Sequence, residues 1–253
     1  MAKQFKEANE SNSFGKSKSD EDFIRFMTSE RPVIKAVIFD SDGTIIDSAA
    51  IFWNICYKIA GHEFPTDFYL ELNGLKDTDL AARVIKRYNL NITPEEFLHQ
   101  KDILMDEEIE HLPLIKGIDQ IIYKLHDMGI PISIATGSQR IPFERKYVNQ
   151  PIIKLFKHII TGEKCKVGKP DPTIFLSAMK MMGDFKPENV LVFEDAYLGV
   201  LAAQRAGMHC AYVHNDPSNV EEQFKIFGIK NAVPHEKNWC DFDFNRYIWE
   251  PQK

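Results

Sequence analysis

The sequence predicts an α/β fold with a doubly wound parallel sheet, and two observations lead to it. Apolar runs rich in β-branched and aromatic residues recur along the chain, as expected of buried strands. The runs are Val33–Phe39, Ile130–Ala135, His158–Ile160, Val190–Phe193 and Cys210–Val213. Helical patterns separate them at Ile118–Met128, Thr173–Met182 and Tyr197–Ala206. Strands that alternate with helices are typical of a parallel sheet covered on both faces.

One long interval breaks this alternation and predicts a separate helical domain. Residues 48–115 contain no convincing strand. Thr93-Pro94-Glu95-Glu96 is typical of a helix start with proline at the first helical position. The helix before it should place five residues on one face, namely Ala81, Ala82, Val84, Ile85 and Tyr88. We therefore expect a small helical domain hinged over the end of the first strand.

These patterns define the expected domain organisation. The polar N-terminus, rich in Ser, Lys, Asp and Glu, is expected to form a flexible tail. The tail takes residues 1–32, a Rossmann-like α/β core takes 33–48 and 116–253, and a helical cap domain takes 49–115.

The composition excludes several classes of protein. The chain has 253 residues and a formal net charge of −6, whereas a nucleic-acid surface is usually basic. No stretch approaches the length of a membrane span, and the N-terminus lacks the apolar core of a signal peptide. The four cysteines are scattered, so we expect reduced thiols in a cytoplasmic protein. The expected partner is a small molecule, and we expect a monomer, although the sequence does not determine the oligomeric state.

The first strand ends on two carboxylates in the segment Asp40-Ser41-Asp42-Gly43. Ligands and catalytic groups of open parallel sheets collect at the carboxyl ends of strands. Two acids at such a place favour a hard cation, and a carboxylate can also act as a covalent nucleophile. An ordinary Asp-Gly turn is the alternative interpretation. An EF-hand calcium loop is excluded, because the glycine comes fourth and the twelfth position is Ile51.

Three further strand ends carry polar groups. Thr136-Gly137-Ser138 could bind an anion through a hydroxyl and backbone N–H groups, or could simply cap a helix. Lys169, between a glycine and a proline, suits a phosphate as a point charge, but a solvated loop lysine has the same surroundings. Glu194-Asp195 ends a very apolar strand, where two acids need a counter-charge. A metal ion shared with Asp40 would supply that charge.

The four segments together, in this order, resemble the motifs of the haloacid dehalogenase superfamily. The resemblance covers about Val33 to Val213. It implies that Asp40 is the nucleophile, which forms an aspartyl-phosphate, and that Asp42 is the general acid and base. It also implies phosphate-binding residues at the next two motifs, which are Thr136, Gly137 and Lys169.

The resemblance further implies a Mg²⁺ cofactor. Asp40, the backbone carbonyl of Asp42 and Asp195 would hold the ion, with Glu194 close by or bound through water. Members of the superfamily that cleave carbon–halogen bonds lack an acid at the position of Asp42, since a halide leaves without a proton. The acid therefore favours phosphate-ester chemistry.

The helical insertion directly after the first motif is similar to the cap of the phosphoglucomutase-like branch. Within that branch the chain resembles the pseudouridine-5′-phosphatase and glycerol-phosphate phosphatase group, in segments such as Phe156–Glu163 and Gly168–Pro172. Substrate choice in this branch lies in the cap. Asn73 and Lys76 are the candidate specificity residues, although a lysine at a helix start is equally often only exposed.

The function expected from this resemblance is a Mg²⁺-dependent phosphatase, a hydrolase of a small nucleotide-like, polyol or sugar phosphomonoester. A sugar-phosphate mutase of the same branch and a non-catalytic phosphate-binding protein are the alternatives. The sequence does not name the physiological substrate.

Two other sets of residues carry structural expectations. Arg140, Arg145 and Lys146 are expected to form a solvated helix face. The aromatic C-terminal residues are expected to pack on the core or on a partner, and they are Trp239, Phe242, Phe244, Tyr247 and Trp249.

Overall fold

A computed structural model describes most of the chain after the N-terminal segment. The described residues are 31–65, 68, 72, 77–165, 167–214, 220–230, 232–236 and 238–251. The chain divides into two compact units, Met1–Pro32 and Val33–Lys253, and everything below concerns the second. The expected tail, residues 1–32, lies outside the described residues except for Arg31 and Pro32.

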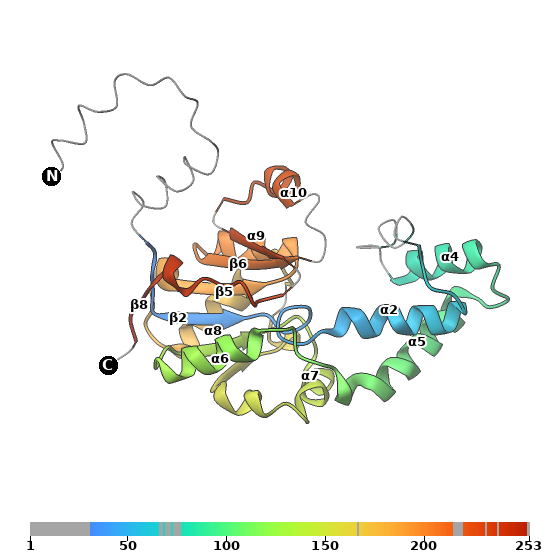
Figure 1. Ribbon diagram of the computed structural model, residues 1–253, viewed down its shortest axis with the longest axis horizontal. Helices are drawn as coiled ribbons and strands as arrows, with labels where there is room; N and C mark the ends of the chain where they lie inside the picture. Colours follow the sequence, from blue (N-terminus) through green and yellow to red (C-terminus); the bar gives the residue numbers. More distant parts are fainter. Residues whose placement is uncertain are drawn as a thin grey trace, which may run out of the picture. The chain divides into compact units, whose positions relative to one another are not determined.

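Six parallel strands form the main sheet in the order β4-β3-β2-β5-β6-β7. They are β2 (Ala36–Phe39), β3 (Ile132–Ala135), β4 (His158–Ile160), β5 (Val190–Glu194), β6 (His209–His214) and β7 (Ala232–Glu236). Figure 1 labels three neighbouring strands of this sheet, β2, β5 and β6. The five strand regions expected from the sequence are confirmed, and β7 was missed. Its segment contains Pro234, which an edge strand tolerates but which weakens the sequence pattern of a strand.

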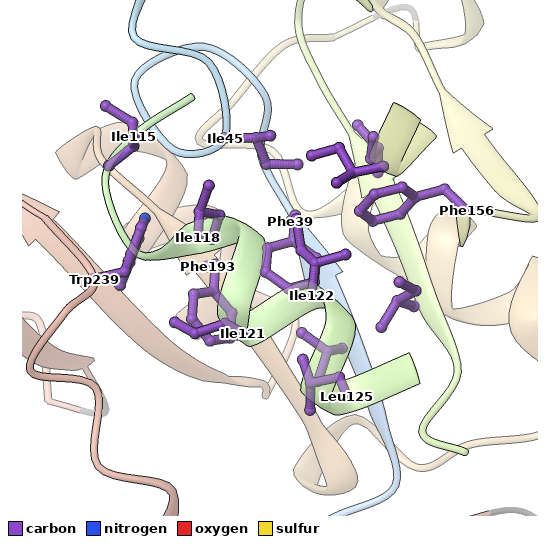
Figure 2. Close-up of a cluster of buried hydrophobic side chains, with 14 of the residues drawn as sticks. Phe39, Ile45, Ile115, Ile118, Ile121, Ile122, Leu125, Phe156, Phe193 and Trp239 are labelled. Carbon is purple, nitrogen blue, oxygen red and sulfur yellow. The ribbon is translucent and has the colours of Figure 1, made fainter. Parts of the chain in front are cut away.

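Helices cover both faces of this sheet, as expected for a doubly wound fold. Along β2, Val37 and Phe39 pack against α6 (Ile118–Asp127) and α7 (Arg140–Tyr147) in one cluster, part of which Figure 2 shows. Ala36 and Ile38 point the other way, into a cluster with α8 (Thr173–Met182) and α9 (Tyr197–Arg205). Because successive strand residues alternate between faces, a strand that is apolar throughout requires a cover on each side.

Several other described elements are short or peripheral. They are α10 (Val220–Phe227) and the 3₁₀ helices η1 (Ile109–His111), η2 (Pro151–Leu155), η3 (Gly162–Lys164), η4 (Pro187–Asn189) and η6 (Phe244–Arg246). The first expected strand is split, because β1 (Val33–Ile34) pairs with β8 (Ile248–Trp249) in a separate two-stranded sheet. None of the described helices is long and apolar enough to cross a membrane. None of the four cysteines forms a disulfide.

The aromatic C-terminal segment packs on the core. Trp239 is fully buried, and its ring lies 4.9 Å from that of Phe193. Its indole Nε1–H donates to the carbonyl of Thr44 at 2.9 Å, so the segment also contacts the loop after β2. Figure 2 shows Trp239 beside Phe193 and the α6 residues Ile118 and Ile121.

Among the described residues between β2 and α6, three α-helices make up most of the segment called here the helical insertion: α2 (Ser48–Ala60), α4 (Asp77–Tyr88) and α5 (Pro94–Glu108). It has its own hydrophobic cluster, which includes Cys56, Phe68 and Phe97. The expected start of α5 is confirmed, since Thr93 and Glu96 form a reciprocal capping box. The expectation for Ala82 is wrong: this residue is exposed, because the buried stripe of α4 is narrower than the sequence suggested.

Candidate active site

A pocket of about 290 Å³ lies at the carboxyl ends of the central strands. In the sheet, β3 and β4 lie on one side of β2, and β5, β6 and β7 lie on its other side. The ends of β2 and β5 are therefore at the switch point, where successive strands begin to be added on the opposite side of β2. Ligand sites of open α/β sheets form at this kind of switch point. Residues from all four predicted motifs line the pocket, together with the start of α9: Asp40, Asp42, Thr136, Gly137, Ser138, Lys169, Glu194, Asp195, Ala196, Leu198 and Gly199.

Lys169 joins the first and last motifs. Its Nζ donates to Asp40 Oδ1 and to Glu194 Oε1, each at 2.5 Å. Both carboxylates are buried, and the Lys169 side chain is only 15% exposed. The ammonium group also lies 4.9 Å from the centre of the Phe175 ring, at the start of α8. The alternative of a solvated loop lysine is therefore wrong.

The pKa values in this group reflect burial and crowded negative charge. Burial raises the pKa of Asp40 from 3.8 to about 7, although Lys169 opposes the shift. Burial also raises the pKa of Asp195 well above its usual value, and Glu194 and Asp40 add to the effect. Burial alone would lower the pKa of Lys169, but the Asp40 and Glu194 carboxylates raise it. Burial is thus the main cause of the raised pKa values of Asp40 and Asp195, and the neighbouring carboxylates add to it.

The backbone after β5 fixes Glu194. Its Oε2 accepts hydrogen bonds from the N–H groups of Asp195 and Ala196, both at 2.8 Å. Gly199, in the first turns of α9, leaves room for the carboxylate, because a Cβ there would lie 1.7 Å from Glu194 Oε1. The helix can thus begin directly behind a buried acid.

Asp195 lies against the loop after β2. Its Oδ1 accepts a hydrogen bond from Thr44 Oγ1 at 3.3 Å. Gly43 has a φ of +77°, and a Cβ on it would lie 1.9 Å from Asp195 Oδ2. Gly43 is therefore required twice, by the turn and by the close approach of the acid.

Asp42 has partners from the second motif and from α7. Its Oδ2 accepts from Ser138 Oγ and its Oδ1 from Lys146 Nζ, both at 2.6 Å. The expectation that Lys146 lies on a solvated face is wrong, since its side chain is 12% exposed. The sequence held a signal for this: Lys146 lies three residues after Phe143 and next to Tyr147, the two buried residues of α7.

The other basic residues of α7 contact nearby segments of the same chain instead of the pocket. Arg145 forms ion pairs with Asp106 of α5 and with Glu110 of η1. Arg140 pairs with Glu144 and Glu163 while remaining about half exposed. Of the three residues expected on a solvated face, Arg140 comes closest to that expectation.

The second motif forms a tight turn with an open side toward the pocket, and it does not cap α7, whose N-cap is Gln139 without a side-chain hydrogen bond. Thr136 is buried, and its Oγ1 accepts from the N–H of Ser138 at 3.1 Å. Gly162 packs directly against this turn, because a Cβ on it would lie 2.2 Å from the carbonyl oxygen of Gly137. Nothing lies within 4 Å of a Cβ built on Gly137, so the turn leaves space on that side for a ligand.

The donor set of the pocket suits a hard divalent cation. Carboxylate and carbonyl oxygens are the ligands that such ions prefer, and four carboxylates, those of Asp40, Asp42, Glu194 and Asp195, meet two lysine side chains here. In the described part of the chain, no three His, Cys, Asp or Glu side chains are already arranged around a common metal position.

The pocket thus brings together seven of the nine residues selected from the sequence. They are Asp40, Asp42, Thr136, Gly137, Lys169, Glu194 and Asp195. The two specificity candidates, Asn73 and Lys76, lie outside the described residues. Sequence reasoning missed Lys146 and Thr44, together with Tyr147, whose hydroxyl is 3.0 Å from Ser41 Oγ.

Comparisons with known proteins agree with this geometry. The family model of haloacid dehalogenase-like hydrolases matches residues 37–213. (DL)-glycerol-3-phosphatase 1 of Arabidopsis thaliana is 31% identical over 72% of this chain and 65% of its own length. A Drosophila melanogaster protein named "Probable pseudouridine-5'-phosphatase" is 30% identical over 74% of this chain and 84% of its own length.

Solved structures show the same fold. A HAD family hydrolase from Deinococcus radiodurans, crystallised with bound phosphate and sodium, is 21% identical. It has a TM-score of 0.69 and covers 81% of this chain and 93% of its own. The chain therefore belongs to the haloacid dehalogenase-like hydrolases, as an enzyme of the phosphoric monoester hydrolase class.

Proposed function

We propose that the protein is a Mg²⁺-dependent phosphatase of a small phosphomonoester and that it acts through an aspartyl-phosphate on Asp40. One observation carries the proposal: Asp40 faces a pocket in which Lys169 and the turn at Thr136 supply a cation and hydrogen-bond donors. These are the groups that a transferring phosphoryl group needs.

In the first step, a carboxylate oxygen of Asp40 forms a bond to phosphorus as the bond to the ester oxygen breaks. Asp42 gives its proton to the leaving oxygen, which departs as an alcohol. In the second step, Asp42 takes a proton from water, and the water oxygen attacks phosphorus, releasing inorganic phosphate and restoring Asp40. Lys169, Thr136 and the N–H groups of the turn stabilise the charge on the phosphoryl oxygens.

A divalent metal ion is general among phosphatases of this family, and the oxygen ligands of the pocket fit Mg²⁺. Asp40, the carbonyl of Asp42 and Asp195 would hold it, with Glu194 beside them. When bound, the ion would reduce the repulsion between the Asp40 carboxylate and the phosphoryl oxygens.

The helical insertion would serve as the cap that selects the substrate, through Asn73 and Lys76. The named activities of two relatives, on glycerol 3-phosphate and pseudouridine 5′-phosphate, make polyol and nucleotide-like phosphates the first substrates to test. A pocket of about 290 Å³ is at the small end of ligand sites, which favours a small ester. A monomer in the cytoplasm stays a prediction.

The test is phosphate release from glycerol phosphates, pseudouridine 5′-phosphate, nucleotides and hexose phosphates, with Mg²⁺ and with a chelator. We expect one ester to be preferred, with activity lost on chelation and restored by Mg²⁺. Asp40→Asn should be inactive while retaining the far-UV circular dichroism of the wild type. Full activity of that variant would contradict the covalent mechanism. Isomerisation of a sugar phosphate, primed by a bisphosphate, would identify a mutase instead.

A further inference from the structure

The carboxylate of Asp42 is held at both of its oxygens. Lys146 Nζ donates to Oδ1 and Ser138 Oγ donates to Oδ2, each at 2.6 Å. Lys146 also donates to Ser138 Oγ at 3.0 Å, which closes a triangle of three hydrogen bonds. A carboxylate held at two points by two connected donors has a defined orientation as well as a defined position.

Lys146 reaches Asp42 from the side of α7. Phe143 and Tyr147, its neighbours on the helix, are 1% and 3% exposed and pack in the core, which fixes the direction of the lysine. Asp42 and Ser138 line the pocket, whereas Lys146 is not among its described lining residues. The lysine therefore supports Asp42 from behind and does not occupy the space of a substrate.

The charges around the pocket make this support necessary. Lys169 is engaged by Asp40 and Glu194, so Lys146 is the cation that the structure places on Asp42. The Asp42 side chain is 31% exposed, against 9% for Asp40. Without Lys146, repulsion from the other carboxylates would favour rotation of Asp42 toward solvent.

We propose that Lys146 is a positioning residue which, together with Ser138, orients the Asp42 carboxyl group toward the leaving oxygen of the substrate. This inference rests on the function proposed above. Proton transfer requires a hydrogen-bond geometry that a rotated side chain does not provide, so the loss of orientation should lower turnover and leave substrate binding intact.

The test compares two classes of leaving group in Lys146→Met, which keeps the length of the side chain and removes its charge. For an alkyl ester such as glycerol phosphate, we expect kcat to fall about 10- to 100-fold with KM changed less than about 3-fold. The leaving group of 2,4-dinitrophenyl phosphate departs without a proton. The rate of the pre-steady-state burst of dinitrophenolate release should therefore be the same in Lys146→Met as in the wild type. An unchanged burst also shows that the variant is folded and that its Asp40 is active.

A double-mutant cycle isolates the path through Asp42. In the Asp42→Asn background, Lys146→Met should lower kcat for the alkyl ester by less than about a further 2-fold, because the carboxyl group that Lys146 positions is already gone. Lys180→Met, an exposed lysine of α8, is the matched control and should resemble the wild type.

Three results would overturn the inference. One is unchanged turnover of the alkyl ester by Lys146→Met in an active enzyme. The second is a loss of kcat from Lys146→Met in the Asp42→Asn background that is as large as its loss in the wild type. The third is a raised KM with an equal loss for both esters, which would make Lys146 a substrate ligand. A wild-type protein that hydrolyses no ester would overturn the proposed function, and this inference with it.

Discussion

The pocket has two sides, and each side pairs a carboxylate of the first motif with a lysine. On the Lys169 side, Asp40 and Glu194 share one ammonium group between the ends of β2 and β5. On the Lys146 side, Asp42 is bound by a lysine and a serine from α7 and the turn before it. Asp40 is buried in the sheet, whereas about a third of the Asp42 side chain is exposed.

The difference corresponds to the two proposed roles. A nucleophile must stay aligned with phosphorus, and burial between two strands allows Asp40 little movement. A group that gives and later takes a proton must reach the leaving oxygen and then a water molecule, and the partly exposed Asp42 carboxylate, held in one orientation by Lys146 and Ser138, is placed to do both. The two sides therefore illustrate how neighbouring acids acquire different roles from their surroundings.

The largest effect is expected on the Lys169 side. Lys169→Met would leave Asp40 and Glu194 without their shared cation, and removing one partner of a buried pair costs about 3–5 kcal/mol. We expect turnover to fall about 1,000-fold or more, together with a lower melting temperature. Phosphate release and thermal unfolding measure the two effects, and Lys180→Met is the control. A loss of less than 10-fold would remove the distinction between the two lysines.

A second prediction tests how rigidly the Lys169 side is built. In Gly199→Ala, the new Cβ must displace the Glu194 carboxylate, and overpacking of this kind costs about 1–3 kcal/mol. We expect lower thermal stability and a weaker response of activity to Mg²⁺. Gly168→Ala is the matched control, since nothing lies within 4 Å of a Cβ there. Equal behaviour of the two variants would show that Glu194 can move freely.

On the Lys146 side, a smaller effect is expected from Ser138→Ala. The change removes one hydrogen bond to Asp42, worth about 0.5–1.5 kcal/mol, and leaves the lysine in place. The kcat for an alkyl ester should therefore fall about 3- to 10-fold by the same conversion. A loss as large as that of Lys169→Met would contradict the view that Lys146 alone still holds Asp42 in this variant.

The smallest effect is expected next to Lys146, at Arg145. This residue links α7 to Asp106 and Glu110, but its side chain is one third exposed, and exposed ion pairs contribute about 0–1 kcal/mol. Arg145→Met should change kcat less than about 3-fold, and the substrate preference should stay the same. A strong change in KM across the ester panel would show instead that α7 controls the helical insertion.

Much of this molecule could be predicted from local patterns. The apolar runs that form β2, β3, β4, β5 and β6 can each be recognised from the sequence alone. Helix α5 begins directly after Thr93, as the capping-box residues Thr93 and Glu96 predict. Edge strand β7 was missed because Pro234 and the polar residues next to it interrupt the apolar pattern expected of a strand. The buried side of α4 was overestimated at Ala82, since alanine is compatible with either face of a helix.

The sequence by itself determined the strand-end groups of the site. The positions of the strands along the chain and the chemistry of the residues after them can both be recognised from local sequence patterns. Asp40, Asp42, Lys169 and Asp195 needed no structure to be selected. Only the tertiary structure decided which lysine serves which acid. Lys146 is 104 residues from Asp42, and its neighbour Arg145 has the same local chemistry. The packing of Phe143 and Tyr147 sets the rotation of α7, and that rotation directs one cation to the pocket and the other to the helical insertion.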